Sequence, residues 1–132
     1  MAQSTEILPN GLQLLQDDRF FKLGQDSVLL SAFAKPRRNA KLLDLGCGTG
    51  ALTLLVWRPA LKITGLELQD GPLDLFRQSI AANELENVTA LQGDLRQMRT
   101  LLPHGSMDYV ICNPPYFDRN AGANAPTAEK RT

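Results

Sequence analysis

The sequence has no long apolar run and few cysteines. No stretch approaches the ~18 residues that a membrane-spanning helix needs, and the N-terminus lacks the basic segment and apolar run of a secretory signal. The two cysteines, Cys47 and Cys112, are too few for a disulfide framework and lack the spacing of a metal site. The sequence therefore predicts a cytoplasmic protein without a membrane contact or a bound metal ion.

An excess of charge is also absent, because basic and acidic residues balance at 14 each. A chain that grips nucleic acid through bulk positive charge is not indicated, although a local basic patch is compatible with this balance. At 132 residues, of which 43% are hydrophobic, the chain suits one domain with a real core. We expect three segments, namely a lead-in over 1–39, a core over 40–120 and a flexible tail over 121–132.

The lead-in predicts a β-hairpin followed by a helix. Two short apolar runs, Gly11–Gln16 and Phe20–Gly24, flank an Asp-Asp turn, which is typical of a hairpin. The helix is expected over Asp26–Ala34, with Asp26 as its N-cap and apolar residues at helical spacing. Pro36 disfavours helical geometry in the residue before it and so ends this helix.

From Lys41 onward, strand-like apolar runs alternate with helical ones. That order predicts an α/β fold of the Rossmann-like type, in which right-handed crossovers join parallel strands. The helix after the second strand is expected to have Asp70 as its N-cap and Pro72 in its first turn, where the missing N–H costs nothing. The expected strands are Lys41–Leu45, Lys62–Leu68, Val88–Gln92 and Met107–Cys112, and the expected helices are Ala51–Trp57, 70–83 and Leu95–Leu102.

A glycine-rich loop, DLGCGTG, joins the first of these strands to its helix. Gly46, Gly48 and Gly50 permit positive φ angles and let a ligand approach the backbone closely. The helix beyond offers unpaired N–H groups to a negative group. Glu67, which ends the next strand 21 residues after Gly46, could accept hydrogen bonds from both hydroxyls of a ribose. The pattern fits NAD and S-adenosylmethionine alike, so it predicts a nucleotide-like cofactor without choosing between them.

Two aspartates bear on that choice. Asp44 precedes the first glycine, where a carboxylate could meet an ammonium group, which S-adenosylmethionine carries and NAD lacks. Asp94 follows the third strand, where it could accept a hydrogen bond from an adenine amino group. With Glu67, these residues place three carboxylates at the carboxyl ends of three strands, the edge at which such sheets bind ligands.

The fourth strand ends abruptly in Asn-Pro-Pro-Tyr. The side-chain oxygen of Asn113 and the carbonyl of Pro114, which the rigid Pro-Pro pair directs, form two acceptors suited to a planar amino group. Tyr116 offers a flat face on which an aromatic base can stack. Two acceptors that pull on the hydrogens of an exocyclic amine localise its lone pair on nitrogen. The segment therefore predicts a site that turns such an amine into a nucleophile and holds it for in-line attack.

In combination, DLGCGTG, Glu67, GDL and NPPY resemble the motifs of class I S-adenosylmethionine-dependent methyltransferases that act on amino nitrogens. The lead-in GLQLLQDDRFFKLGQDSVLLSAFA is similar to that of the bacterial enzymes which methylate adenine N6 in the anticodon loop of valine tRNA. This resemblance implies an S-adenosylmethionine cofactor and a tRNA substrate. It also implies a set of site residues: Asp44, Gly46, Gly48 and Gly50 at the methionine end of the cofactor, Glu67 at its ribose, Asp94 and the Leu95 N–H at its adenine, Asn113 and Pro114 at the target amine, and Tyr116 against the target base.

Members of that family continue for further strands, for which this chain has no residues. We therefore expect an N-terminal fragment or an early-terminated reading frame, in which the fourth strand has an unpaired edge. A long apolar edge invites pairing with another chain, so a homodimer through this strand is one expectation.

Other readings of the same residues stay open at this point. The motif also suits a glutamine amide in a protein, or an amino group in ribosomal RNA or DNA. The chain could instead bind the cofactor without catalysis. An NAD-binding domain is a further alternative, but it leaves Asn113–Tyr116 unexplained.

Overall fold

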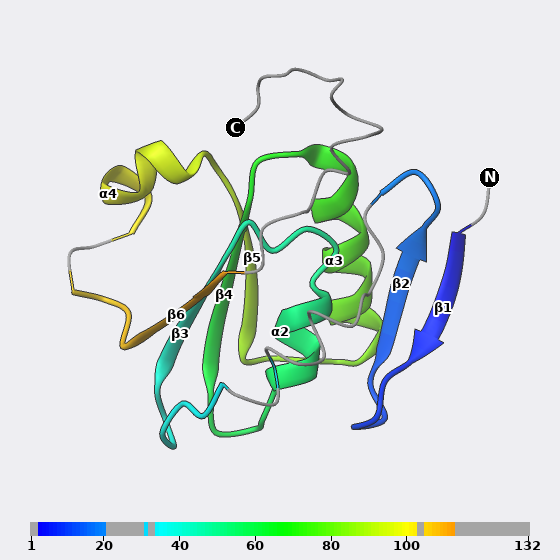
Figure 1. Ribbon diagram of the computed structural model, residues 1–132, viewed down its shortest axis with the longest axis horizontal. Helices are drawn as coiled ribbons and strands as arrows, with labels where there is room; N and C mark the ends of the chain where they lie inside the picture. The colour runs from blue at the N-terminus through cyan, green and yellow to red at the C-terminus, as the bar shows by residue number, and fades with distance from the viewer. Residues whose placement is uncertain (1–2, 21–30, 32–33, 103–104, 113–132) are drawn as a thin grey trace, which may run out of the picture.

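A parallel sheet of four strands forms the centre of the molecule, and a two-stranded hairpin lies beside it (Figure 1). The computed structural model describes residues 3–20, 31, 34–102 and 105–112. The predicted helix over Asp26–Ala34, the Asn113–Tyr116 segment and the predicted tail thus lie wholly or almost wholly outside the described residues. The α/β Rossmann-like prediction is confirmed for the part of the core that is described.

The sheet has the strand order β5-β4-β3-β6. β3 (Lys41–Leu45) pairs in parallel with β4 (Lys62–Glu67) on one side and with β6 (Tyr109–Cys112) on the other, and β5 (Val88–Gln92) lies beyond β4. The chain therefore moves outward from β3 to β5 and then crosses back to the other side of β3. In open α/β sheets, ligands bind at the carboxyl ends of the strands where the direction of the connections reverses. Here that point lies between β3 and β6.

Helices cover both faces of this sheet. Figure 1 shows α2 (Ala51–Val56) and α3 (Asp70–Ala82) on one face, and α4 (Met98–Leu101), which continues the 3₁₀ turn Leu95–Gln97, on the other. These bounds agree with the predicted helices to within a few residues. The prediction of Asp70 as an N-cap is wrong: Gln69 is the N-cap residue, and Asp70 is the first residue of α3. The carboxylate of Asp70 instead accepts a hydrogen bond from Gln92 at the end of β5.

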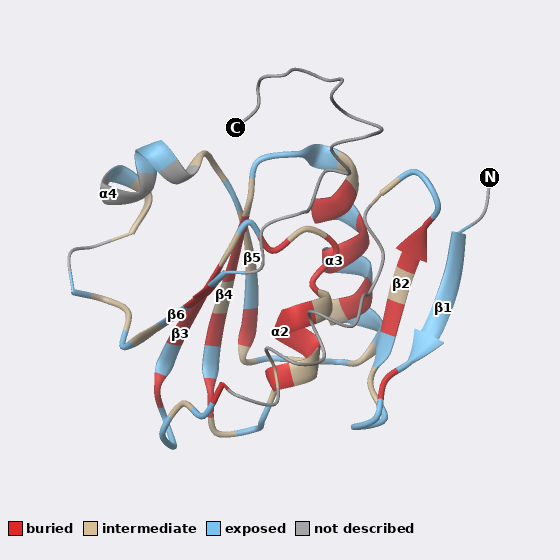
Figure 2. Cartoon of the chain, in the orientation of Figure 1, coloured by how far each residue is buried: buried red, intermediate tan, exposed pale blue. Residues whose placement is uncertain are grey.

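The core lies between the sheet and its two longer helical neighbours, where Figure 2 shows buried residues on the facing sides. Apolar side chains of β3 and β4 meet those of α2 and α3 there, and Phe76 is fully buried among them. Burying an aromatic side chain of this size stabilises a fold by several kcal/mol, on the order of 25 cal/mol per Å². The main cluster includes Leu42, Leu52, Val56, Ile63, Leu73, Phe76 and Ile111.

The N-terminal hairpin is present, but its strands differ from those predicted. β2 (Gln13–Asp17) agrees with the expected first strand, and its antiparallel partner is β1 (Gln3–Ile7). The predicted second strand, Phe20–Gly24, lies outside the described residues except for Phe20. The turn is made by Pro9-Asn10-Gly11, in which Gly11 has a φ of +89° and its N–H donates to the Leu8 carbonyl at 2.8 Å. Asn-Gly is a strong turn signal, so the sequence did carry the information that places the hairpin earlier.

Side chains of α3 and of its C-cap residue hold the inner edge of β2, which faces away from β1. The backbone N–H of Leu15 donates to the Ser79 hydroxyl at 2.9 Å. The Asn83 side chain accepts from the Gln13 N–H and donates to the Gln13 carbonyl, both at 2.8 Å. The hairpin is therefore docked on α3 by polar contacts that replace a neighbouring strand, and this avoids an unpaired inner edge.

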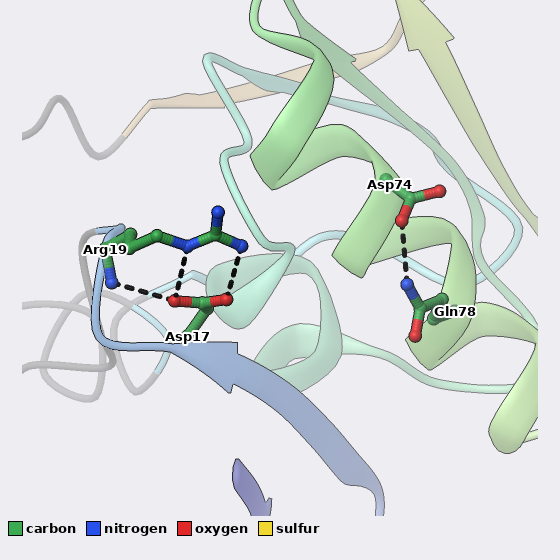
Figure 3. Close-up of polar contacts among 4 residues, drawn as sticks. All are labelled: Asp17, Arg19, Asp74 and Gln78. Atoms are coloured by element: carbon green, nitrogen blue, oxygen red, sulfur yellow. Dashed lines mark hydrogen bonds and ion pairs between the residues drawn. The ribbon is translucent and has the colours of Figure 1, made fainter. Parts of the chain in front are cut away.

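Ser79→Ala is expected to lower the free energy of unfolding by about 1 to 2 kcal/mol. The Ser79 side chain is fully buried, so its removal leaves the Leu15 N–H without a hydrogen-bond acceptor. The free-energy cost of that unpaired donor exceeds the small gain in helix propensity from alanine. Urea denaturation measures the change. Gln78→Ala, one residue earlier, is the matched control, because Gln78 is exposed and bonds only along the helix, to Asp74 at 2.7 Å (Figure 3). It should cost less than about 0.5 kcal/mol; equal costs for the two variants would contradict docking through Ser79.

Candidate functional site

Three of the predicted acidic residues lie along one edge of the sheet. Asp44 is near the end of β3, Glu67 ends β4 and Asp94 follows β5. The strands are parallel and paired in register, so their carboxyl ends share this edge. We call this the carboxylate edge, defined by Asp44, Glu67 and Asp94.

The glycine loop after β3 has the backbone that its sequence requires. Gly46, Gly48 and Gly50 all have positive φ angles, of 63°, 58° and 91°. A Cβ atom placed on Gly46 or Gly48 would meet no atom of the described residues within 4 Å, so these two glycines face open space in that part of the chain. At Gly50 a Cβ would lie 2.1 Å from the Phe76 ring, so this glycine lets the loop pack on the core. The first two glycines thus leave room for a ligand, whereas the third allows the packing.

Asp44 lies buried beneath this loop. The residue is 1% exposed, and its Oδ2 accepts a hydrogen bond from the Thr53 hydroxyl at 2.6 Å. Burial raises the pKa of Asp44 to about 7, although the hydrogen bonds from Thr53 act in the opposite direction. Glu67 raises this pKa further, so the carboxylate is held in a site that disfavours its negative charge. A positively charged ligand would relieve that penalty.

Glu67 ties the glycine loop to the strand beside it. Its Oε1 accepts from the Gly48 N–H at 2.8 Å, and its Oε2 accepts from the Gln69 N–H at 3.0 Å. The Cys47 N–H also donates to the Leu66 carbonyl at 3.0 Å. The sequence predicts that Glu67 faces ribose hydroxyls. It does not predict these hydrogen bonds from the backbone to the Glu67 carboxylate. A carboxylate has about four lone-pair sites, so capacity for further donors is left.

Leu68 is a residue at this edge that sequence reasoning missed. It directly follows Glu67 and is 58% exposed. The available signal was its position, one residue past the predicted ribose carboxylate. An exposed apolar surface here suits the flat face of a ring system.

Asp94 already has a strong partner. Arg96 donates to both carboxylate oxygens, with the closest contact at 2.5 Å, and its backbone N–H donates to Oδ1 at 2.9 Å. This arginine holds the pKa of Asp94 down, at about 2. Leu95 begins the 3₁₀ turn between them. An adenine base that donates a hydrogen bond to Asp94 would share the accepting oxygen with Arg96. Arg96 was not among the residues predicted from the sequence.

A second ion pair closes the end of β2 beside the first turn of α3. Asp17 is buried, and the exposed Arg19 grips both of its oxygens, at 3.0 and 2.7 Å (Figure 3). Arg19 holds the pKa of Asp17 at about 2 and lies 5.2 Å from the centre of the Phe20 ring. A Cβ on Gly71 would lie 2.3 Å from that ring, so Phe20 sits directly on the start of α3. The lead-in thus reaches the same end of the molecule as the carboxylate edge.

The predicted catalytic segment begins one residue past the described end of β6. Leu45 of β3 and Cys112 of β6 are register partners, so β6 ends next to the start of the glycine loop. Burial and the charge of Asp44 both raise the pKa of the Cys112 thiol, which agrees with this proximity. Asn113, Pro114 and Tyr116 themselves lie outside the described residues, and their roles stay predictions.

A groove of about 600 Å³ lies at the opposite, amino end of the sheet. Trp57 lines it and donates through Nε1 to the Asn87 side chain at 2.8 Å. Asn87 in turn donates to the carbonyls of Arg58 and Leu61. These hydrogen bonds hold together the loops that connect strands and helices at this end of the sheet. We therefore assign the groove a role in the fold and not in ligand binding.

The described part of the chain lacks two other kinds of site. No group of three or more side chains there could hold a metal ion. Nor does any helix of the described residues have the length and apolar character to cross a bilayer.

Comparisons with known proteins give one consistent result. The family described as methyltransferase small domain matches residues 24–129. A "tRNA1(Val) (adenine(37)-N6)-methyltransferase" of Pseudoalteromonas translucida (strain TAC 125) is 34% identical over 105 residues, which are 78% of this chain and 44% of that protein. A protein of the same name from Yersinia pestis (strain Pestoides F) is 31% identical over 100 residues, or 73% of this chain and 40% of that one. The chain therefore spans less than half the length of these curated relatives.

Solved structures share the fold. The T. thermophilus 16S rRNA N2 G1207 methyltransferase, solved with AdoMet and guanosine, superposes with a TM-score of 0.70 at 23% identity, over 88% of this chain and 33% of that one. The M. jannaschii tRNA m1G37 methyltransferase gives a TM-score of 0.66 at 20% identity, over 87% and 36%. At these identities the likeness concerns the fold alone.

Proposed function

The chain belongs to the methyltransferase small domain family, and from that premise we propose that it uses S-adenosylmethionine to methylate the N6 amino group of adenine in tRNA. The observation that carries the proposal is the coincidence of two findings. The glycine loop and the carboxylate edge meet at the reversal point of the sheet, and the relatives at 31–34% identity are named as tRNA adenine-N6 methyltransferases.

The residues at this edge fit a cationic cofactor better than an anionic one. Gly46 and Gly48 leave open space in front of the loop. Within the described residues, Arg96 on Asp94 is the one cation paired with a member of the carboxylate edge. S-adenosylmethionine carries an ammonium and a sulfonium group, whereas NAD would bring two phosphate charges towards Asp44 and Glu67. The repulsion of like charges in a partly buried site favours S-adenosylmethionine.

Each acidic residue then has a distinct part in binding. Asp44, beneath the loop, would accept from the ammonium group at the methionine end. Glu67 would use its remaining lone pairs for the ribose hydroxyls, with Leu68 exposed beside it for the flat face of adenine. Asp94 and the Leu95 N–H would contact the edge of the adenine, where Arg96 fixes the orientation of the Asp94 carboxylate.

The chemistry at the target amine falls to the segment after β6. When bound, the cofactor supplies an electrophilic methyl group. Asn113 and Pro114 would accept the two hydrogens of the adenine N6 amine, so that its lone pair points along the line of attack. Tyr116 would stack on the target base, which has to leave its own stack to reach this position. Positioning of this kind supplies much of the rate in transfers that need little general-base strength.

Calorimetry and methyl transfer together test the proposal. The chain should bind S-adenosylmethionine and not NAD, and should transfer methyl to unmodified valine tRNA. Asn113→Ala should keep the cofactor affinity but lower the transfer rate about 100-fold, because one of two preorganised acceptors is lost. Asn124→Ala, in the predicted tail, is the matched control and should change neither quantity.

The outcomes separate the competing functions. Binding of NAD alone would refute the methyltransferase proposal. Binding of S-adenosylmethionine without transfer to any nucleic acid would leave a cofactor-binding module. Transfer that Asn113→Ala leaves intact would refute the role of the Asn-Pro-Pro-Tyr segment.

A further inference from the structure

The buried pair of Asp44 and Thr53 is not accounted for by the ligand contacts proposed above. Thr53 is fully buried and Asp44 is 1% exposed, so neither side chain can exchange its partner for water. The Thr53 hydroxyl donates to Oδ2 of Asp44 at 2.6 Å, which is short for a hydrogen bond of this kind. Bonds to a carboxylate are shorter and stronger than those between neutral groups. Thr53 therefore holds Asp44 tightly.

The hydrogen bond between Thr53 and Asp44 joins the two ends of the glycine loop. Asp44 lies near the end of β3 and Thr53 in the first turn of α2, with the whole loop between them. A threonine hydroxyl inside a helix usually bonds a carbonyl of the preceding turn. Here it donates to Asp44 instead, and Thr53 thereby lowers the pKa of this carboxyl against the effect of burial.

The hydrogen bond from the buried Thr53 hydroxyl to Oδ2 fixes how the Asp44 carboxylate is turned. The terminal torsion of an aspartate is broad, so an orientation has to be imposed by neighbours. We propose that Thr53 is a positioning residue that turns the Asp44 carboxylate towards the ligand space in front of the glycine loop, for an ammonium group to bind. This inference rests on the proposed function, because that function supplies the ammonium.

The remaining neighbours of Asp44 cannot do this. Glu67 on β4 is an acid, and Cys47 in the loop and Cys112 on β6 are thiols whose pKa values are raised by burial and by nearby negative charge. The negative charge of Glu67 disfavours ionised Asp44, and no hydrogen bond from either thiol to this carboxylate is present among the described residues. Thr53 is thus the neighbour whose donor favours the charged form that an ammonium requires.

Thr53→Val and Thr53→Ser test the proposal through cofactor affinity and its pH dependence. Valine keeps the shape and removes the donor, whereas serine keeps the donor and removes a methyl group. Calorimetry with S-adenosylmethionine should show affinity rising from about pH 6 as Asp44 ionises, and falling again above about pH 8, where the amino group of the ligand loses its proton; the midpoint is that of the rising part. For Thr53→Val we expect about 10-fold weaker binding near pH 7 and a midpoint about one unit higher, because a donor to the charged form is lost. Thr53→Ser should restore both values to those of the wild type.

Each outcome decides one question. If the wild-type chain does not bind S-adenosylmethionine, the proposed function fails first. If it binds, and Thr53→Val has the same affinity and the same midpoint, the positioning role is refuted. A uniform loss of affinity with an unmoved midpoint would also refute it, since a merely structural defect would act in that way. Should Thr53→Val fail to fold while Thr53→Ser folds, the hydroxyl serves the fold and the positioning role is rejected.

Discussion

Gly50→Ala is expected to lower the free energy of unfolding by about 3 kcal/mol, the sum of two penalties. Gly50 has a φ of +91°, and a side chain in the left-handed region costs about 1 kcal/mol or more. The added Cβ would also lie 2.1 Å from the Phe76 ring, and overpacking a core costs about 1 to 3 kcal/mol. The ring has no room to retreat, because on its other edge it meets Gly65, where a Cβ would lie 2.4 Å away. Urea denaturation without cofactor measures the loss.

Gly46→Ala is the matched control for that experiment. Gly46 also has a positive φ, of 63°, but its Cβ would meet no atom within 4 Å among the residues that the structure describes. It should therefore show the backbone penalty alone, about 1 kcal/mol. Phe76→Leu combined with Gly50→Ala should cost less than the two single changes added together, because the smaller side chain relieves the contact. Equal losses for Gly46→Ala and Gly50→Ala would contradict the packing of the loop on Phe76.

The sequence predicted the parts of this site that depend on local pattern. The positions of β3, β4 and β5, the three positive-φ glycines and the placement of Asp44, Glu67 and Asp94 along one edge follow from apolar runs and turn residues. Such features depend on residues close together in the sequence. Because the strands are parallel, their carboxyl ends lie on the same side of the sheet.

The structure added what depends on residues distant in sequence. The sequence could not show that Thr53 reaches back over the loop to Asp44, nor that Glu67 bonds the Gly48 N–H. It also could not show that Phe76 is wedged between Gly50 and Gly65. Contacts of this kind depend on how far a helix is rotated about its axis against the sheet. The spacing of apolar residues predicts which face of the helix is buried, but not that rotation angle.

The position of the hairpin turn differs from the prediction for another reason. The sequence predicts a turn at Asp17-Asp18, whereas Asn10-Gly11 joins β1 to β2, and Asp17 ends β2 as the buried partner of Arg19. Both dipeptides are compatible with a turn, and the structure shows a chain reversal at the first and a capped strand end at the second. The choice was decided by β2 packing on α3, which no local signal reports.

The buried carboxylate of Asp44 should make the stability of the chain fall as the pH rises. Its pKa is 3.8 in the unfolded chain and about 7 in the folded one, so between these values the folded state binds the extra proton. Stability from this group is therefore greatest below pH 4 and is lost as the pH rises towards 7. Between pH 5 and pH 8 the loss amounts to about 3 kcal/mol, because a slope of about 1.4 kcal/mol per unit applies only over the two units up to the folded-state pKa of about 7.

Asp44→Asn isolates this effect, because asparagine does not titrate. The free energy of unfolding of both proteins, measured in urea at pH 5 and at pH 8, gives a difference that is free of other titrating groups and of any constant cost of the amide. Relative to the wild type, the variant should gain about 3 kcal/mol between the two pH values. A difference that stays constant would mean that Asp44 is ionised in the folded chain at pH 5. The same burial that costs stability at neutral pH is what would draw a cation to Asp44, so S-adenosylmethionine should restore the lost stability to the wild type and not to Asp44→Asn.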